Sequence, residues 1–169
     1  MAFQTTPADS LFANRFDLNL TAKLDADDTL HAHAEVTTRG DDEVYYRYQF
    51  RRVPESQWKE LEEKESYAAD LGATISNVRA RSPEKIDEPF TDAFDYTLKD
   101  FAEGDKHRFR LPFASSLPTL KDEDSKRTTP LWIGYGGELH YEVRIELPKG
   151  WSTTQLPPME LQESRCETQ

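Results

Sequence analysis

The alternation of hydrophobic and polar residues is the clearest structural signal in this sequence. Hydrophobic side chains occupy every second position from Phe16 to Leu24 and again from Leu30 to Val36. A period of two places such residues on one face of a β-strand. The intervening sequence Asp-Ala-Asp-Asp is typical of a turn. We therefore predict a β-hairpin over residues 16–38, with one buried and one polar face, and we expect Gly40 to end it.

The next hydrophobic segment has two interpretations. Its apolar residues alternate as in a strand, but Val44 and Tyr48 also lie one helical turn apart. We favour a helix over residues 42–53. A firmer helix is predicted over residues 55–71, because a proline precedes it, apolar residues recur at helical spacing, and Gly72 suits the position after a helix C-terminus.

Further strands are predicted downstream of this helix. A short extended segment begins at Ile75 and Val78, and Pro148 and Gly150 end the last and longest alternation. The polar, proline-containing residues 117–126 are expected to form a surface connection. The alternating hydrophobic sets are Phe94, Tyr96 and Leu98; Phe109, Leu111 and Phe113; and Leu139, Tyr141, Val143, Ile145 and Leu147.

Together these elements predict an α+β, mainly β fold. We expect an antiparallel sheet in a sandwich-like domain, with one or two helices inserted between the second and third strands. The length of 169 residues suits one domain. We place this β-rich domain at residues 14–160, between an N-terminal flank (1–13) and a polar C-terminal tail (161–169).

Charge and hydropathy limit the classes of partner. A formal net charge of -11 repels phosphate backbones, so we expect no nucleic-acid partner. The acidic runs at residues 25–28, 60–65 and 121–126 are expected to be solvated. The N-terminal sequence lacks the basic and apolar regions of a signal peptide, and no apolar run approaches the length of a membrane-spanning helix. We therefore expect no export signal and no membrane insertion.

Few residues suggest catalysis or metal binding. His31, His33 and Glu35 share one strand face, and two imidazoles with a carboxylate can bind zinc or iron. Because they lie on the polar side of a hairpin, we expect solvated side chains, no cofactor and no stoichiometric transition metal on elemental analysis. His107 and His140 lack a nearby nucleophile turn, and Cys166 lies in a polar tail without a base. We predict no catalytic residue.

An aromatic cluster near the C-terminus is the best candidate for a ligand surface. Trp132, Tyr135 and Trp151 could present flat apolar area with polar edges, as glycan- or peptide-binding sites do. Core packing is the commoner role of such residues, and we favour it. The glycine-rich Gly-Tyr-Gly-Gly at 134–137 is expected to turn the chain, because it lacks the ending of a phosphate loop.

The order of several short motifs resembles that of a known family. A strand pair and a helix are followed by three further motifs and a closing Leu-Pro-x-Gly-Trp. Over about residues 14–160 this order is similar to the C-terminal β-rich region of bacterial transglutaminase-like superfamily proteins, which pair an N-terminal domain of unknown function with a papain-like core. The motif residues are Asp87, Pro89 and Phe90; Arg110 to Phe113; Arg127, Pro130 and Leu131; and Leu147 to Trp151.

This resemblance implies a non-catalytic accessory or interaction domain. In the family, chemistry is expected from a Cys, a His and an Asp in a separate upstream domain, and no position of this chain matches them. The resemblance also implies a protein partner or a covalently linked transglutaminase-like domain, and a periplasmic or extracellular location of the parent proteins. The alternative that we carry forward is a glycan- or peptide-binding β-sandwich.

Overall fold

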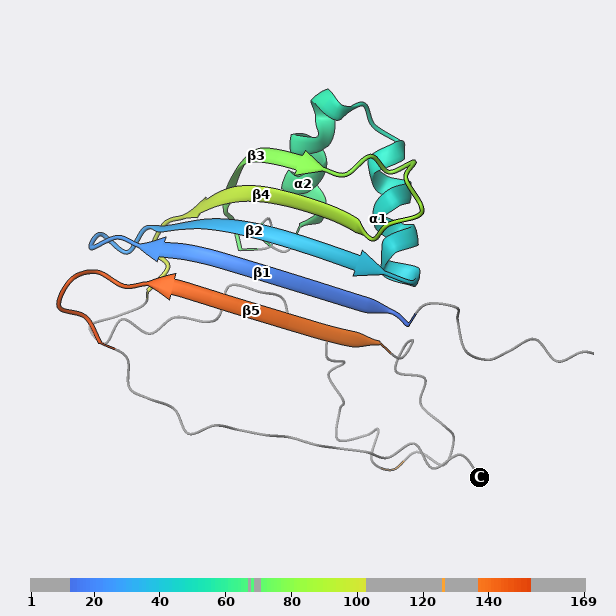
Figure 1. The fold of residues 1–169 in the computed structure, drawn as a ribbon. Helices are drawn as coiled ribbons and strands as arrows, with labels where there is room; N and C mark the ends of the chain where they lie inside the picture. Colours follow the sequence, from blue (N-terminus) through green and yellow to red (C-terminus); the bar gives the residue numbers. More distant parts are fainter. Residues whose placement is uncertain (1–12, 67, 69–70, 103–125, 127–136, 153–169) are drawn as a thin grey trace, which may run out of the picture.

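A computed structural model describes residues 13–66, 68, 71–102, 126 and 137–152, and these form one β-sheet with helices against it (Figure 1). The α+β, mainly β class is therefore confirmed. The chain runs through β1 and β2, then α1, the 3-10 turn η1 and α2, and then β3, β4 and β5. Their bounds are Arg15–Leu24 (β1), Leu30–Arg39 (β2), Asp41–Arg51 (α1), Glu55–Gln57 (η1), Trp58–Glu65 (α2), Thr74–Ala80 (β3), Phe90–Leu98 (β4) and Glu138–Glu146 (β5).

The strand order in the sheet is β3-β4-β2-β1-β5. The predicted hairpin is confirmed, with Leu24 opposite Leu30 at its closed end. The pairs β2–β4 and β3–β4 are antiparallel as expected, but β5 runs parallel to β1, so the sheet is mixed. The long connection between Leu98 and Glu138 permits this parallel pairing, whereas a tight turn would impose an antiparallel one.

One face of the sheet carries the hydrophobic core. Most of the alternating residues predicted to be buried in β1, β2 and β4 are buried, including Leu18, Leu20, Phe94 and Tyr96. Phe16, Ala22 and Leu98 are partly buried. A second cluster lies where α1 and α2 meet the sheet, and its buried members are Phe50, Trp58 and Phe90. The helices thus cover the β2, β4 and β3 side of the apolar face.

A β-bulge explains the unusual spacing of hydrophobic residues in β3. Ile75 and Val78 both pack against the core although they are three residues apart, which a regular strand does not allow. Asn77 has a positive φ of 53°, and the pairing register with β4 shifts between Ser76 and Arg79. The extra residue returns Val78 to the buried face.

The helices partly match the prediction. The helix favoured for residues 42–53 is confirmed as α1. The helix expected over residues 55–71 is shorter, because it begins as a 3-10 turn and α2 ends where Ser66 becomes extended, with ψ of 151°. The expectation that the acidic run 60–65 is solvated is wrong for Glu62, whose exposed fraction is 3%.

Several predicted features lie outside the described residues. These include the strand around Leu111, His107, Cys166, the Arg127 motif, and two of the three residues of the aromatic surface, Trp132 and Tyr135. The end of the last strand is described: β5 stops at Glu146, and Gly150 adopts a φ of 88° in the turn that follows. None of the described helices is long and apolar enough to cross a membrane.

Candidate functional site

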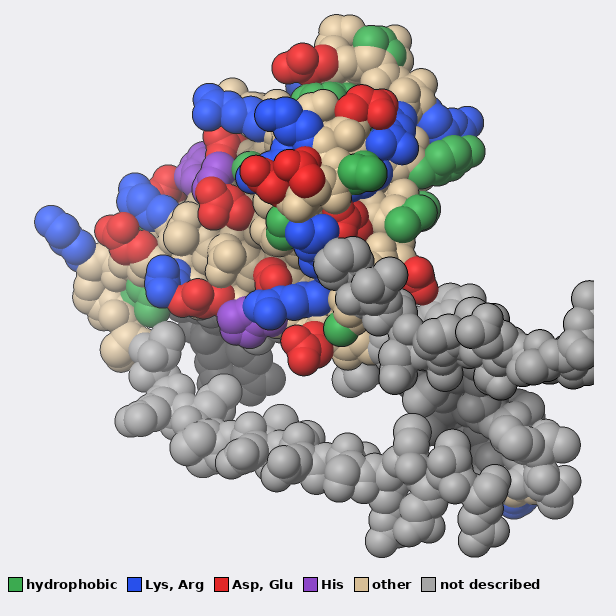
Figure 2. All heavy atoms as spheres, turned by 45° about the vertical axis from the view of Figure 1, so that its right-hand side comes forward, with side chains coloured by type: hydrophobic (Ala, Val, Ile, Leu, Met, Phe, Trp, Pro, Cys, Tyr) green, Lys and Arg blue, Asp and Glu red, His purple; other side chains and the backbone are tan. Residues whose placement is uncertain are grey.

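The face of the sheet opposite the helices is polar and carries His31, His33 and His140. Figure 2 shows acidic, basic and histidine side chains interspersed over the strands. A shallow hollow of about 500 Å³ lies over β1, β2, β4 and part of β3 on this face. Its polar side chains are Thr21, Lys23, His31, His33, Ser76, Asp95 and Thr97.

Asp95 is the best-connected group in this hollow. His33 Nδ1 lies 2.6 Å from one of its carboxylate oxygens, and Asn77 Nδ2 donates to the other at 2.6 Å. The bulge in β3 is what turns the Asn77 amide towards β4. The hydrogen bond from Asn77, and next that from His33, lowers the pKa of Asp95. Asp95 is therefore an ionised anchor that orients His33.

His31 has a looser set of neighbours. Its Nδ1 lies 3.3 Å from Thr97 Oγ1, and its Nε2 lies 3.4 Å from an oxygen of Asp25. The other oxygen of Asp25 pairs with Lys23 Nζ at 2.8 Å, and this bond lowers the pKa of Asp25. All of these groups are substantially exposed, so solvent screens their interactions.

The arrangement of these histidines does not favour metal binding or acyl transfer. Within the described ranges, His, Cys, Asp and Glu side chains form no group of three that could hold a metal ion. The free nitrogen of His33 faces Glu35, with 3.7 Å between Nε2 and the carboxylate oxygen. Moreover, β2 and β4 are flanked by strands on both sides, so their N–H groups are used in the ladders and cannot stabilise an oxyanion.

Helix α1 buries a charged pair beside its core residue Phe50 and exposes apolar residues on its other side. The residues it buries include the charged pair Glu43 and Arg47. Its outer face exposes Val44, Tyr45 and Tyr48, with exposed fractions of 68%, 50% and 57%. An amphipathic helix normally places its apolar residues against the core and its charges in solvent. We call Val44, Tyr45 and Tyr48 the outer face of α1.

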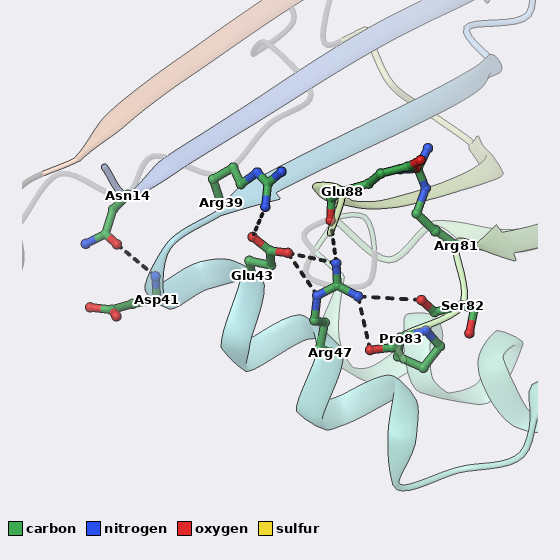
Figure 3. A network of polar contacts seen from close by, with 9 residues as sticks. All are labelled: Asn14, Arg39, Asp41, Glu43, Arg47, Arg81, Ser82, Pro83 and Glu88. Atoms are coloured by element: carbon green, nitrogen blue, oxygen red, sulfur yellow. Dashed lines mark hydrogen bonds and ion pairs between the residues drawn. The ribbon is translucent and has the colours of Figure 1, made fainter. Parts of the chain in front are cut away.

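The buried charges of α1 hold the β3–β4 connection in place (Figure 3). Arg47 Nε and Nη2 donate to one oxygen of Glu43 at 2.9 and 2.7 Å. The guanidinium also donates to the backbone carbonyls of Pro83 at 3.0 Å and Glu88 at 2.6 Å, with a longer contact to Ser82 at 3.5 Å. Arg47 thus satisfies carbonyl groups of a connection that lacks regular structure, and we interpret it as structural.

A pair of buried acids lies between α2 and the sheet. Asp92, in β4, and Glu62, in α2, each have an exposed fraction of 3%. Among the described residues, neither carboxylate oxygen of Asp92 has a hydrogen-bond partner. Burial, and next the charge of Glu62, raises the pKa of Asp92 well above its ordinary value. Burial, with a smaller contribution from Glu65, raises the pKa of Glu62 to about 7.

The sequence pattern offered a partial signal for these missed residues. Asp92 is in phase with Phe90 and Phe94, so the alternation places it on the buried face. Glu62 lies one helical turn after Trp58, which is buried. Of the predicted aromatic surface, only Trp151 is described, and it is partly buried against the hydrophobic core. His140 is exposed on the polar face, 3.5 Å from Asp17.

Comparison of the chain with protein-family models, with curated proteins and with solved structures finds no match in any of the three.

Proposed function

We propose that this chain is a non-catalytic interaction domain that works with a transglutaminase-like protein, either within one longer chain or as a separate partner. The observation that carries the proposal is the apolar surface that α1 leaves exposed. This helix directs Arg47 and Glu43 inwards and leaves Val44, Tyr45 and Tyr48 in solvent. Apolar surface exposed in this way supports a role in binding a protein partner.

The outer face of α1 has the properties of an interface anchor. Its tyrosines are held in place before binding: Tyr45 Oη donates to Glu65 at 2.9 Å and accepts from Gln49 at 3.1 Å. The Arg52 guanidinium lies 5.2 Å from the ring centroid of Tyr48. Tyrosine and arginine are enriched among the residues that dominate binding energy. The complementary surface is an apolar groove with a polar rim, as in other complexes that accept a helix face.

The polar face supports the non-catalytic part of the proposal. His33 is oriented by a carboxylate, as a catalytic base would be, but its other nitrogen faces Glu35. His31 lies near the hydroxyl of Thr97 and the carboxylate of Asp25, at a site where the backbone N–H groups of β2 and β4 are used in the ladders. Acyl transfer needs an activated nucleophile and an oxyanion site together. The described residues offer neither at this face.

Site-specific photocrosslinking in the source cells tests the proposal. A photoreactive amino acid replaces Tyr48 in one variant and the exposed Asn19, on the polar sheet face, in a control variant. We expect position 48 alone to crosslink to a transglutaminase-like domain, identified by mass spectrometry as part of the same chain or of another. Equal crosslinking from both positions, or none from position 48, contradicts the assignment of the interface.

A parallel activity measurement tests the absence of catalysis. We expect the isolated chain to show no hydrolase or acyl-transfer turnover with peptide and amine substrates. Turnover that survives Cys166→Ser and disappears in His33→Ala would show that the polar face is an active site and would refute the proposal.

A further inference from the structure

We propose that Asp92 and Glu62 form an internal proton-binding site that fastens helix α2 to the sheet. Asp92 remains a neutral carboxylic acid in the folded domain, and Glu62 takes up a second proton as the pH falls through neutrality. The fold is then more stable at mildly acidic than at alkaline pH, and α2 is the element that loosens when the protons leave. This inference is independent of the proposed protein partner.

The two carboxyl groups are both buried. Each residue has an exposed fraction of 3%, and they come from different elements, β4 and α2. Transfer of an ionised carboxylate into such an environment is costly unless a cation or several hydrogen bonds compensate. A buried acid without these partners becomes neutral instead.

The neighbours of the pair supply no such compensation. Both Asp92 oxygens, and the hydroxyl oxygens of Thr38 in β2 and Ser66 after α2, are buried without hydrogen-bond partners in the described part of the chain. The guanidinium of Arg47 in α1 is engaged by Glu43 and by backbone carbonyls.

The titratable groups that act on the pair are themselves acidic. Glu65, in α2, raises the pKa of Glu62. The charges of Asp92 and Glu62 in turn contribute to the raised pKa of Tyr46, in α1, of which burial is the largest cause. Arg79, in β3, and Arg81, which follows β3, line a hollow of which Asp92 is also a lining residue, but neither arginine donates a hydrogen bond to the Asp92 carboxyl group. Two negative charges at Asp92 and Glu62 would therefore repel each other in a site of low polarity.

The location of the pair gives the protons a structural role. Phe90 and Phe94 flank Asp92 in β4 and are buried, so β4 cannot turn this carboxyl to solvent without exposing them. Helix α2 is short, at 8 residues, and is followed at once by the extended Ser66. Movement of α2 away from β4 is the simplest way to hydrate both charges. Deprotonation should therefore weaken the packing of α2 first.

The equilibrium test uses isosteric variants and a matched control. Urea unfolding is measured from pH 5.5 to 9 in buffer containing a chelator, for wild type, Asp92→Asn, Glu62→Gln and the control Glu60→Gln, which makes the same chemical change on the exposed side of α2. The native state holds protons that the unfolded state releases, so the unfolding constant of wild type rises with pH. We expect the ratio of the wild-type unfolding constant to that of Asp92→Asn to rise about tenfold per pH unit between pH 6 and 8.

The other variants sharpen the result. Glu62→Gln should remove only the part of the pH dependence of the unfolding constant that levels off near pH 7. Glu60→Gln should have the same pH profile as wild type. Parallel pH profiles of wild type and Asp92→Asn would overturn the proposal.

A direct measurement on wild type keeps the test decisive even where a variant fails to fold. Carbon-13 NMR of the Asp and Glu carboxyl groups should show one Asp with the chemical shift of a protonated acid at pH 7, and one Glu that titrates near pH 7. Titration of every Asp below pH 5 would overturn the proposal. Amide hydrogen exchange then tests the role of α2: its protection should fall more than that of α1 between pH 6 and 9, whereas equal losses would refute a local effect.

Discussion

Replacement of Arg47 by alanine should destabilise the domain strongly. The side chain is almost fully buried, with an exposed fraction of 5%, and its guanidinium donates to Glu43 and to backbone carbonyls of the β3–β4 connection. In the alanine variant, the buried carboxylate of Glu43 would lose one of its two arginine partners. The backbone carbonyls of Pro83 and Glu88 would lose the hydrogen bonds from the guanidinium.

The magnitude follows from these contacts. Removal of one partner of a buried ion pair costs about 3–5 kcal/mol, because the remaining charge is uncompensated. Arg39 Nη1 lies 3.2 Å from the second oxygen of Glu43 and would keep part of the pairing, so we expect about 3 kcal/mol. This is a large part of the total stability of a typical domain, about 5–15 kcal/mol.

Arg51→Ala is the matched control on the same helix. Arg51 donates to Pro83 at 2.8 Å and pairs with Glu84 at 3.1 Å, but its side chain is 41% exposed. Exposed ion pairs contribute little, so its loss should cost under about 1 kcal/mol. Urea unfolding followed by circular dichroism measures both variants, with an unchanged m-value as the sign that the unfolded states are comparable.

Two outcomes bear on the reasoning. If Arg47→Ala lies within about 1 kcal/mol of Arg51→Ala, the guanidinium is not a structural centre and the argument fails. The double variant Glu43→Gln with Arg47→Met should be more stable than Arg47→Ala, because no buried charge is then left unpaired. A double variant as unstable as the single one would indicate that the lost carbonyl contacts, and not the charge, dominate.

Two further predictions concern local geometry. Gly40→Ala should lower the free energy of unfolding clearly more than Gly72→Ala in the same assay. Both glycines have a positive φ, but of the two only Gly40 has a neighbour that an added Cβ would meet, the Asn14 Cα at 2.9 Å. Equal losses of stability would contradict this reasoning. Asn77→Gly should raise the pKa of Asp95, measured by carboxyl NMR titration, because it keeps the bulge conformation and removes the main hydrogen bond that lowers this pKa. A carboxyl group whose pKa is lowered by folding stabilises the folded state at pH values above its unfolded pKa, and this stabilisation is lost as the pH falls through the folded pKa. The variant should therefore be less stable at neutral pH, by under about 1 kcal/mol because Asp95 is partly exposed.

The sequence pattern was sufficient for most local structure. Strict alternation fixes which side of a strand is buried, because a shift of one residue would expose the whole hydrophobic set. This reasoning found β1, β2, β4 and β5, and helical spacing found α1. It overestimated the length of α2, because helical spacing continues past the position where the backbone becomes extended at Ser66.

The candidate surfaces were harder to predict. The sequence placed His31 and His33 on a polar face, where they lie. It did not pair His33 with Asp95, because these residues are 62 positions apart and meet only through the β2–β4 register. It also treated Val44 and Tyr48 simply as one helical face, without showing that this face points to solvent.

What the sequence determined by itself is the set of strands and helices and the polarity of each face, since both follow from short-range periodicity. What only the tertiary structure decided is which charged residues lie inside. Glu62 belongs to an acidic run that composition alone assigns to solvent, and Asp92 comes from another element. Their burial, and that of Arg47, depends on how α1 and α2 pack on the sheet, because the free energy of a buried charge is set by neighbours that are distant in the sequence.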